Sequence, residues 1–262
     1  MATYTFYKYQ GAGNDFVIVD NRNLLFDRDN TDLVRRLCDR RFGVGADGLM
    51  LLQDVDGYDF EMVYFNADGR EGSMCGNGGR CIVAFAKDQG IIGETTDFLA
   101  VDGQHRADID SQQGTVRLQM IDVDAIERHG EAYVLDTGSP HYVALVDGLA
   151  DFPVVAEGRR VRNSERYRSE GINVNFVEAE GAGYFMRTYE RGVEDETLAC
   201  GTGATAVAIA MAAHEGQDGP LAIPIRVAGG NLTIRFHKNG SRFTDVFLEG
   251  PAKFVFKGEI TV

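Results

Sequence analysis

The chain has 262 residues, of which 44% are hydrophobic and 25% are charged, and its formal net charge is −14. This composition is typical of a folded globular protein. The negative charge disfavours nucleic acid and anionic membrane surfaces as partners, because both bind basic patches. The first ten residues lack the long apolar run of a signal peptide. We therefore expect a cytoplasmic protein without a nucleic-acid or membrane partner.

In the first half of the chain, short alternating or continuously apolar segments predict strands. They cover residues 4–9, 16–19, 48–52 and 60–65, and a helical pattern covers residues 31–40. The residues after Cys75 are G-N-G-G-R-C-I-V-A-F-A-K-D-Q-G. They predict a glycine turn, a helix that is apolar on nearly every face, and a terminating glycine at Gly90. A helix without a polar stripe must be buried all round.

The second half of the chain repeats this order. Predicted strands cover residues 134–135, 142–146, 173–177, 184–189, 225–227, 232–236 and 246–248. The residues after Cys200 are G-T-G-A-T-A-V-A-I-A-M-A-A-H-E-G, which again predict a glycine turn, a buried helix and a terminating glycine, Gly216. A last strand is predicted at residues 252–262, after Pro251.

Two sequence features recur at nearly one offset. G-A-G-N-D-F-V-I-V-D ends at Asp20, and G-S-P-H-Y-V-A-L-V-D ends at Asp147, 127 residues later (147 − 20). C-G-N-G begins at Cys75, and C-G-T-G begins at Cys200, 125 residues later (200 − 75). We interpret this recurrence as an internal duplication.

The duplication predicts an α+β fold with two pseudo-symmetric lobes. Each lobe is expected to be a curved, mainly antiparallel sheet wrapped round a buried central helix. We expect the N-terminal lobe to comprise residues 1–119 and the C-terminal lobe residues 120–250. The final strand, residues 251–262, is expected to return to the N-terminal lobe.

Cys75 and Cys200 both stand where a loop enters a helix. Unpaired backbone N–H groups and the helix dipole favour negative charge there, which lowers the pKa of a thiol below its free value of about 8.5. Two such copies imply a site between the lobes in which the cysteines face each other. One thiolate would remove a hydrogen from a stereogenic carbon, and the opposite thiol would return a proton to the other face. The alternative is that both are small buried residues at tight turns. Cys38 and Cys81 lack this setting and are predicted to be core thiols.

Four motifs in the chain resemble the diaminopimelate epimerase family. They are Q-G-A-G-N-D-F-V-I-V-D, D-R-R-F-G-V-G-A-D-G, F-N-A-D-G-x-E-x-x-M-C-G-N-G-x-R-C and Y-E-R-G-V-x-x-E-T-x-A-C-G-T-G-A, and they lie between Gly11 and Ala204 in family order. The resemblance implies interconversion of LL- and meso-2,6-diaminopimelate, a small-molecule substrate, without pyridoxal phosphate, metal or another cofactor. It also implies a homodimer.

The resemblance further implies roles for individual residues. Cys75 and Cys200 would be the acid–base pair. Substrate contacts would come from Asn14, Asn66, Gly76, Asn77, Asn173, Glu190, Arg191, Gly201 and Thr202, and supporting contacts from His141 and Ser139. Several of these have simpler interpretations. Asn14 and Asn66 could hydrogen-bond only to the backbone of local turns. Glu190 and Arg191 could be an exposed ion pair, and His141 could simply be a residue at the start of a strand.

The chain departs from the family pattern at two positions. Ser139 stands where many relatives have Asn, and Gly48 stands where some carry Gln. Three alternative functions stay open at this point. They are a two-cysteine racemase or epimerase of another amino acid such as proline or hydroxyproline, a thiol redox protein that joins Cys75 and Cys200 in a disulfide, and a non-catalytic amino-acid-binding module.

Overall fold

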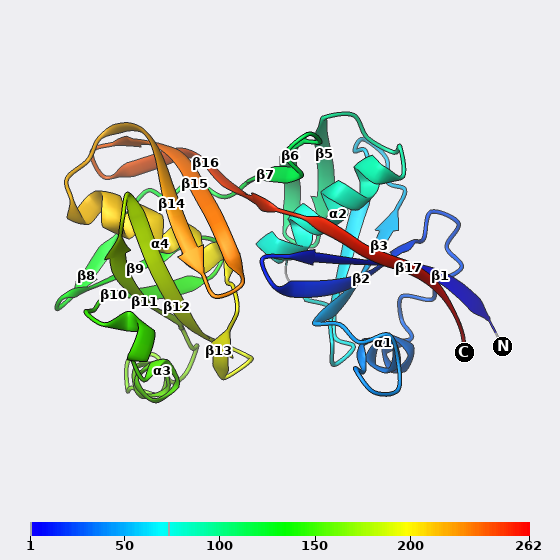
Figure 1. The fold of residues 1–262 in the computed structure, drawn as a ribbon, viewed down its shortest axis with the longest axis horizontal. Coiled ribbons are helices and arrows are strands. Elements are labelled where there is room, and N and C mark those ends of the chain that lie inside the picture. The colour runs from blue at the N-terminus through cyan, green and yellow to red at the C-terminus, as the bar shows by residue number, and fades with distance from the viewer. Residues whose placement is uncertain (1, 73) are drawn as a thin grey trace. The chain divides into compact units, whose positions relative to one another are not determined.

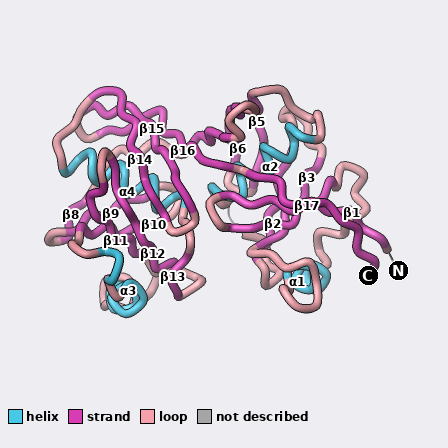
Figure 2. Tube along the Cα trace, in the orientation of Figure 1, coloured by secondary structure: helices cyan, strands magenta, loops and turns pink. Residues whose placement is uncertain are grey.

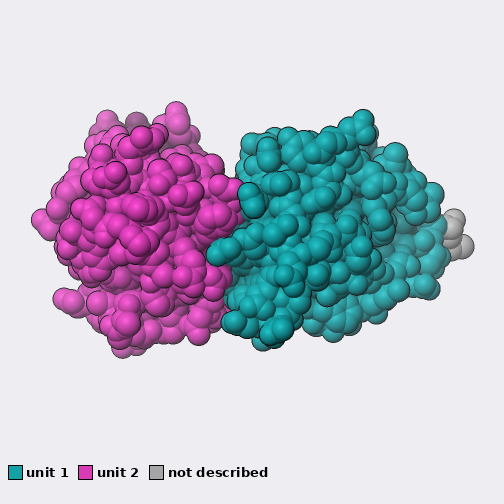
Figure 3. All heavy atoms as spheres, turned by 90° about the horizontal axis from the view of Figure 1, so that it is seen from above, with its two compact units in different colours: residues 1–118, 250–262 teal, residues 119–249 magenta. Residues whose placement is uncertain are grey.

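The computed structural model describes residues 2–72 and 74–262, and the chain divides into two compact units. Unit 1 comprises residues 1–118 and 250–262, and unit 2 comprises residues 119–249. Figure 3 shows the two units in different colours. Strands make up most of the regular structure in each of them (Figure 2).

Unit 1 contains one mixed sheet. Its strands in chain order are β1 (Thr3–Gly11), β2 (Asn14–Asp20), β3 (Gly48–Gln53), β4 (Glu61–Asn66), β5 (Thr95–Ala100), β6 (Gly103–Asp110), β7 (Thr115–Gln119) and β17 (Lys253–Thr261). Neighbouring strands pair in the order β17-β1-β2-β3-β4-β5-β6-β7. The pairs β2–β3 and β4–β5 are parallel and the others are antiparallel.

Unit 2 repeats this sheet. Its strands are β8 (Glu127–His129), β9 (Ala132–Asp136), β10 (Pro140–Leu145), β11 (Asn173–Glu180), β12 (Gly183–Glu190), β14 (Gly219–Val227), β15 (Gly230–Asn239) and β16 (Arg242–Pro251), with the short β13 (Asp195–Thr197) beside β12. They pair in the order β8-β9-β10-β11-β12-β14-β15-β16, with β10–β11 and β12–β14 parallel. The strand order and the two parallel pairs match those of unit 1, which confirms the predicted duplication.

A buried helix lies inside the sheet of each unit (Figure 1). In unit 1, α2 (Gly76–Asp88) contacts β1, β2, β3, β6 and β17, and in unit 2, α4 (Gly201–His214) contacts β9, β10, β11, β12, β14 and β15. Both helices are followed by a glycine in the left-handed region, Gly90 with φ 69° and Gly216 with φ 68°. The predicted helices and their glycine ends are therefore confirmed.

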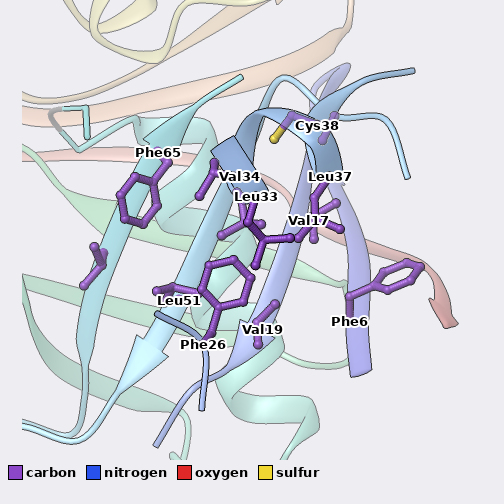
Figure 4. Close-up of a cluster of buried hydrophobic side chains, with 13 residues drawn as sticks. Phe6, Val17, Val19, Phe26, Leu33, Val34, Leu37, Cys38, Leu51 and Phe65 are labelled. Carbon is purple, nitrogen blue, oxygen red and sulfur yellow. The ribbon is translucent and has the colours of Figure 1, made fainter. Parts of the chain in front are cut away.

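A second helix covers the outer face of each sheet. In unit 1 this is α1 (Thr31–Cys38). Asn30 caps its N-terminus, because the Asn30 side chain accepts a hydrogen bond from the Leu33 amide. Figure 4 shows that Leu33, Val34 and Leu37 pack on Val17, Val19 and Leu51. Strands β2 and β3 are thus buried on both faces, which explains their continuously apolar sequences.

Several elements were not predicted from the sequence. In unit 2 the outer helix is α3 (Val154–Arg162), preceded by a short 3-10 helix, η1 (Leu149–Asp151). Strands β5, β6 and β7 were also missed, because their few apolar residues stand among polar and charged ones. Strands β8 and β13 were missed because each has only three residues, none of them apolar. Within the described residues, no helix has the length and apolar character needed to cross a membrane.

Candidate active site

Cys75 and Cys200 occupy the same position in the two units, immediately before the central helix. Both have extended backbones, with φ −98° and ψ 124° at Cys75 and φ −122° and ψ 111° at Cys200. Each carbonyl accepts the first hydrogen bond of its helix, from Gly79 at 2.7 Å and from Ala204 at 2.9 Å. The N–H groups of the first helical turn lack partners within the helix, so each thiol lies beside donors that suit an anion.

In unit 1, the first turn of α2 carries a buried network. The Asn77 side chain donates to Oδ1 of Asn14, the first residue of β2, and accepts from Nη2 of Arg80 at 3.0 Å. Arg80 is fully buried and also donates to the carbonyl of Gly76 at 3.2 Å. Burial lowers the pKa of Arg80, while the thiols of Cys81 and Cys75 act in the opposite direction. A guanidinium stays protonated under such a shift, so α2 begins beside a buried positive charge.

Asn14 is held in turn by a group of charged residues. Its Nδ2 donates to Oδ2 of Asp47 at 3.0 Å, and Arg40 forms ion pairs with both Asp47 and Asp15. Lys8, which is buried, forms an ion pair with Asp15 at 2.7 Å. Although burial raises the pKa of Asp15, hydrogen bonds from Arg40 and Lys8 hold it well below its usual range. This group fixes the orientation of the Asn14 amide.

The space left by Gly48 is filled by an aromatic ring. A Cβ atom at Gly48 would lie 2.5 Å from Cε2 of Tyr64 on the neighbouring strand, and one at Gly72 would lie 2.9 Å from Cε1 of the same ring. That Cβ atom at Gly72 would also lie 2.8 Å from Nδ2 of Asn66, the last residue of β4. Gly48 is therefore required by the packing of Tyr64.

In unit 2, a polar cluster lies against the first turn of α4. His141 is fully buried, and its Nε2 lies 2.9 Å from Oγ1 of Thr202 and 3.0 Å from Oγ of Ser139. Oγ1 of Thr202 lies 3.5 Å from Sγ of Cys200. Burial, followed by the charge of Arg191, lowers the pKa of His141 to about 3, so the imidazole is neutral.

Asn173 and Asn175 flank this cluster on β11. Asn175 donates from Nδ2 to the Tyr142 carbonyl at 3.0 Å and accepts from Thr188 at 2.9 Å. Its Nδ2 also lies 3.1 Å from Nδ1 of His141. Oδ1 of Asn173 accepts the backbone N–H of Arg191 at 2.9 Å. The sequence predicted Asn173 as a site residue but not Asn175, although residues two positions apart in a strand lie on the same face of the sheet.

The remaining predicted contacts lie at the end of β12. Glu190 accepts a hydrogen bond from Oγ1 of Thr197 at 2.8 Å, and Arg191 donates from Nη1 to the Glu170 carbonyl at 3.1 Å. Unit 1 thus brings Asn14 and Asn77 together at the start of α2, with Asn66 beside the loop that leads to Cys75. Unit 2 brings Ser139, His141, Asn173 and Thr202 together near Cys200.

The other two cysteines lie in the core, as predicted. All four cysteines are thiols. Burial raises the pKa of Cys38 and that of Cys81 to about 12. Both therefore stay protonated at neutral pH, and neither is available as a base or nucleophile.

Solved structures of other proteins share this fold. A phenazine biosynthesis protein of the PhzF family from Bacillus anthracis matches with a TM-score of 0.81 and 13% identity over 100% of both chains. A hydroxyproline epimerase from Agrobacterium vitis matches with a TM-score of 0.69 and 13% identity over 98% of this chain and 92% of that one. The fold is therefore the duplicated two-lobed fold of these proteins, with a central helix in each lobe.

Sequence relatives identify the family. The diaminopimelate epimerase family model matches the chain twice, over residues 6–135 and 133–255, once for each half. The diaminopimelate epimerase of Flavobacterium psychrophilum is 52% identical over 97% of this chain and 99% of its own length. That of Chlorobaculum tepidum is 41% identical over 96% and 99%. The chain belongs to the diaminopimelate epimerase family, and it is an isomerase.

Proposed function

We propose that the chain interconverts LL- and meso-2,6-diaminopimelate by a two-base proton transfer between Cys75, Cys200 and the substrate α-carbon, without pyridoxal phosphate or metal. The observation that carries this proposal is the equivalence of the two helix starts. Each presents one thiol at the position before a buried helix, beside the N–H groups of its first turn. Together with membership of the family, this supports a pair of thiols that exchange roles.

The proposed reaction begins with one cysteine as thiolate and the other as thiol. The thiolate Sγ takes the α-hydrogen as a proton, and the electron pair of the broken C–H bond passes into the α-carboxylate, which becomes enediolate-like. The opposite thiol then donates its proton to the other face of the same carbon. After one turnover the two protonation states are exchanged, so the reverse reaction uses the same groups. The mechanism requires both thiols to reach one carbon.

Backbone amides are proposed to bind the α-carboxylate. The N–H groups of Gly76, Asn77, Gly201 and Thr202 belong to the first turns of the two helices. Preorganised donors at such positions stabilise the charge that develops on the carboxylate in the transition state. For Asn77 the proposed contact is the backbone N–H, which belongs to the first turn of α2.

The distal end of the substrate carries an ammonium and a second carboxylate. We assign the Arg191 guanidinium to that carboxylate and the Glu190 carboxylate, with the Asn14, Asn66 and Asn173 amides, to the amino groups and remaining oxygens. Asn14 and Asn173 are oriented by hydrogen bonds to Asp47 and to the Arg191 backbone, which supports a fixed binding geometry. We also propose a homodimer, which the resemblance to the family implies, and a cytoplasmic location, which the composition led us to expect.

The experiment is an epimerisation assay with purified, reduced protein. LL-diaminopimelate should give the meso isomer, and Cys75→Ala and Cys200→Ala should each lose about 1,000-fold or more in rate. Cys38→Ala is the matched control, since this thiol lies in the core of unit 1, and it should retain the parent rate. A panel including proline and hydroxyproline tests substrate choice. A folded, reduced protein that epimerises only proline derivatives would contradict the assignment, as would full activity in either active-site variant.

A further inference from the structure

The Asn175 amide in unit 2 has only one orientation that satisfies its neighbours. Its Nδ2 lies 3.0 Å from the carbonyl oxygen of Tyr142, and its Oδ1 lies 2.9 Å from Oγ1 of Thr188. A backbone carbonyl can only accept a hydrogen bond, so the NH2 group must face Tyr142. The second hydrogen of this NH2 group then points to Nδ1 of His141, 3.1 Å away. Nδ1 of His141 must therefore be an acceptor.

An acceptor at Nδ1 determines where the hydrogen of the His141 ring lies. The ring is neutral because burial and the charge of Arg191 lower the pKa of His141 to about 3. A neutral imidazole with an accepting Nδ1 carries its hydrogen on Nε2. Nε2 faces two hydroxyl oxygens, Oγ1 of Thr202 at 2.9 Å and Oγ of Ser139 at 3.0 Å. His141 is thus a donor to these hydroxyl groups.

The orientation of the Ser139 hydroxyl follows from Asn173. Oδ1 of Asn173 accepts the Arg191 backbone N–H, so the Asn173 NH2 group faces the Pro140 carbonyl at 3.3 Å and Oγ of Ser139 at 3.2 Å. Oγ of Ser139 therefore accepts a hydrogen bond from Asn173, and it faces the hydrogen on Nε2 of His141. Its own hydroxyl hydrogen is left to point to Oγ1 of Thr202, 3.3 Å away.

Thr202 now has one direction in which to donate. Its Oγ1 faces donors from His141 and Ser139, and it lies 3.5 Å from Sγ of Cys200. We propose that these residues form a one-way hydrogen-bond relay in which the Thr202 hydroxyl makes the last donation, to Sγ of Cys200, and favours the thiolate of that cysteine. Asn175 is the positioning residue that sets the direction of the relay.

The relay gives a physical role to the departure at Ser139. A hydroxyl can accept from Asn173 and donate to Thr202 at once, whereas the NH2 of an amide can only donate and its oxygen can only accept. Hydrogen bonds to an ionised group are stronger than those to a neutral one and lower the pKa of an acid. The hydrogen bonds of the relay are independent of the proposed function. Only the role of the Cys200 thiolate as a base rests on it.

The first test reads the tautomer of His141 in the unsubstituted protein. Long-range 1H–15N correlation NMR distinguishes a ring that carries its hydrogen on Nε2 from one that carries it on Nδ1. The signal of His141 among the five histidines is assigned by its loss in His141→Gln. We expect a neutral ring with the hydrogen on Nε2. A hydrogen on Nδ1, or a protonated ring at neutral pH, would overturn the relay.

The second test reads the Cys200 thiolate without using activity. The ultraviolet absorbance of the thiolate is titrated in Cys75→Ala, and the titration of the Cys75→Ala/Cys200→Ala protein is subtracted. Cys38 and Cys81, whose pKa is about 12, do not contribute below about pH 10. Adding Thr202→Val should raise the midpoint by about one pH unit, whereas Thr202→Ser should restore it.

Thr188→Val is the matched control for a buried hydrogen bond in the same cluster. It removes the donor to Oδ1 of Asn175, while the Tyr142 carbonyl still orients the amide. The free energy of unfolding should fall, and the midpoint of the Cys200 thiolate titration should stay unchanged. An unchanged midpoint in Thr202→Val refutes the relay whether or not the parent epimerises diaminopimelate. A shifted midpoint in a protein inactive on that substrate would keep the relay and refute only the proposed function.

Discussion

The central helices of the two units begin with the same backbone conformation, but they differ in the side chains that surround the cysteine. Five residues after each cysteine stand Arg80 in α2 and Thr205 in α4. Both donate to the carbonyl of the first helical residue, at 3.2 Å to Gly76 and at 3.1 Å to Gly201. Arg80 brings a buried positive charge to this position, whereas Thr205 brings a neutral hydroxyl.

The residues two positions after each cysteine differ in the same way. The Asn77 side chain is hydrogen-bonded to Arg80 and Asn14, within a network that includes the Asp47 carboxylate. Thr202 is bonded to His141 and lies beside Cys200. The duplicated fold thus provides two equivalent thiol positions, and it supports one with a buried cation and the other with neutral hydrogen bonds. The predictions below test this difference.

Replacing the buried cation should have the largest effect. Arg80→Met removes the donors to Gly76 and Asn77 and the charge near Cys75, so the free energy of unfolding should fall by about 3 kcal/mol. In a Cys200→Ala background, the thiolate titration of Cys75 should shift upward by about one pH unit. Thr205→Val is the matched change in unit 2 and should cost only about 1 kcal/mol. Urea unfolding and the thiol titration measure both effects, and equal losses in the two variants would remove the distinction.

A second pair of variants tests how tightly each helix start is packed. A Cβ atom at Gly203 would lie 2.5 Å from Oδ1 of Asn175 and 3.2 Å from Sγ of Cys200. A Cβ atom at Gly78 would lie 3.3 Å from the flexible Met50 sulfur. Gly203→Ala should therefore cost about 2 kcal/mol and most of the activity, while Gly78→Ala should cost less than about 1 kcal/mol. Thermal unfolding and steady-state rates of the two variants provide the comparison. Similar losses in both would contradict the packing difference.

A third prediction concerns the pH dependence of stability. The pKa of His141 is lowered to about 3 in the native protein, and it is about 6.5 in an unfolded chain. Between these values the unfolded chain binds a proton that the native protein does not. Stability therefore falls as the pH drops from about 6.5 towards 3, by about 1.4 kcal/mol per pH unit from this residue. His141→Gln should lose that contribution to the slope, and the exposed control His237→Gln should keep it. Equal slopes in urea unfolding between pH 6 and 4 would show that His141 is not buried as a neutral ring.

Local sequence patterns were sufficient to predict the parts of the molecule that depend on neighbours in the chain. The buried helices, their glycine ends and the cysteine positions before them follow from the residues around Cys75 and Cys200. The side chains that were missed depend on strand register instead. Asn175 meets His141 because β10 and β11 pair in parallel, and Tyr64 fills the space at Gly48 because β3 and β4 pair. Arg80 gave a signal that could have been used, since a charged residue in a helix buried all round requires partners.

The most direct test of the central claim, that two thiols act on opposite faces of one carbon, is the early course of the reaction in deuterated water. LL-diaminopimelate should give meso product that carries deuterium at the inverted carbon, while the recovered LL substrate stays unlabelled. The reason is that the returning proton comes from a thiol that has already exchanged with solvent. If deuterium enters the recovered substrate as fast as the product, or if the product retains its original hydrogen, a single base serves both faces and the two-cysteine mechanism is wrong.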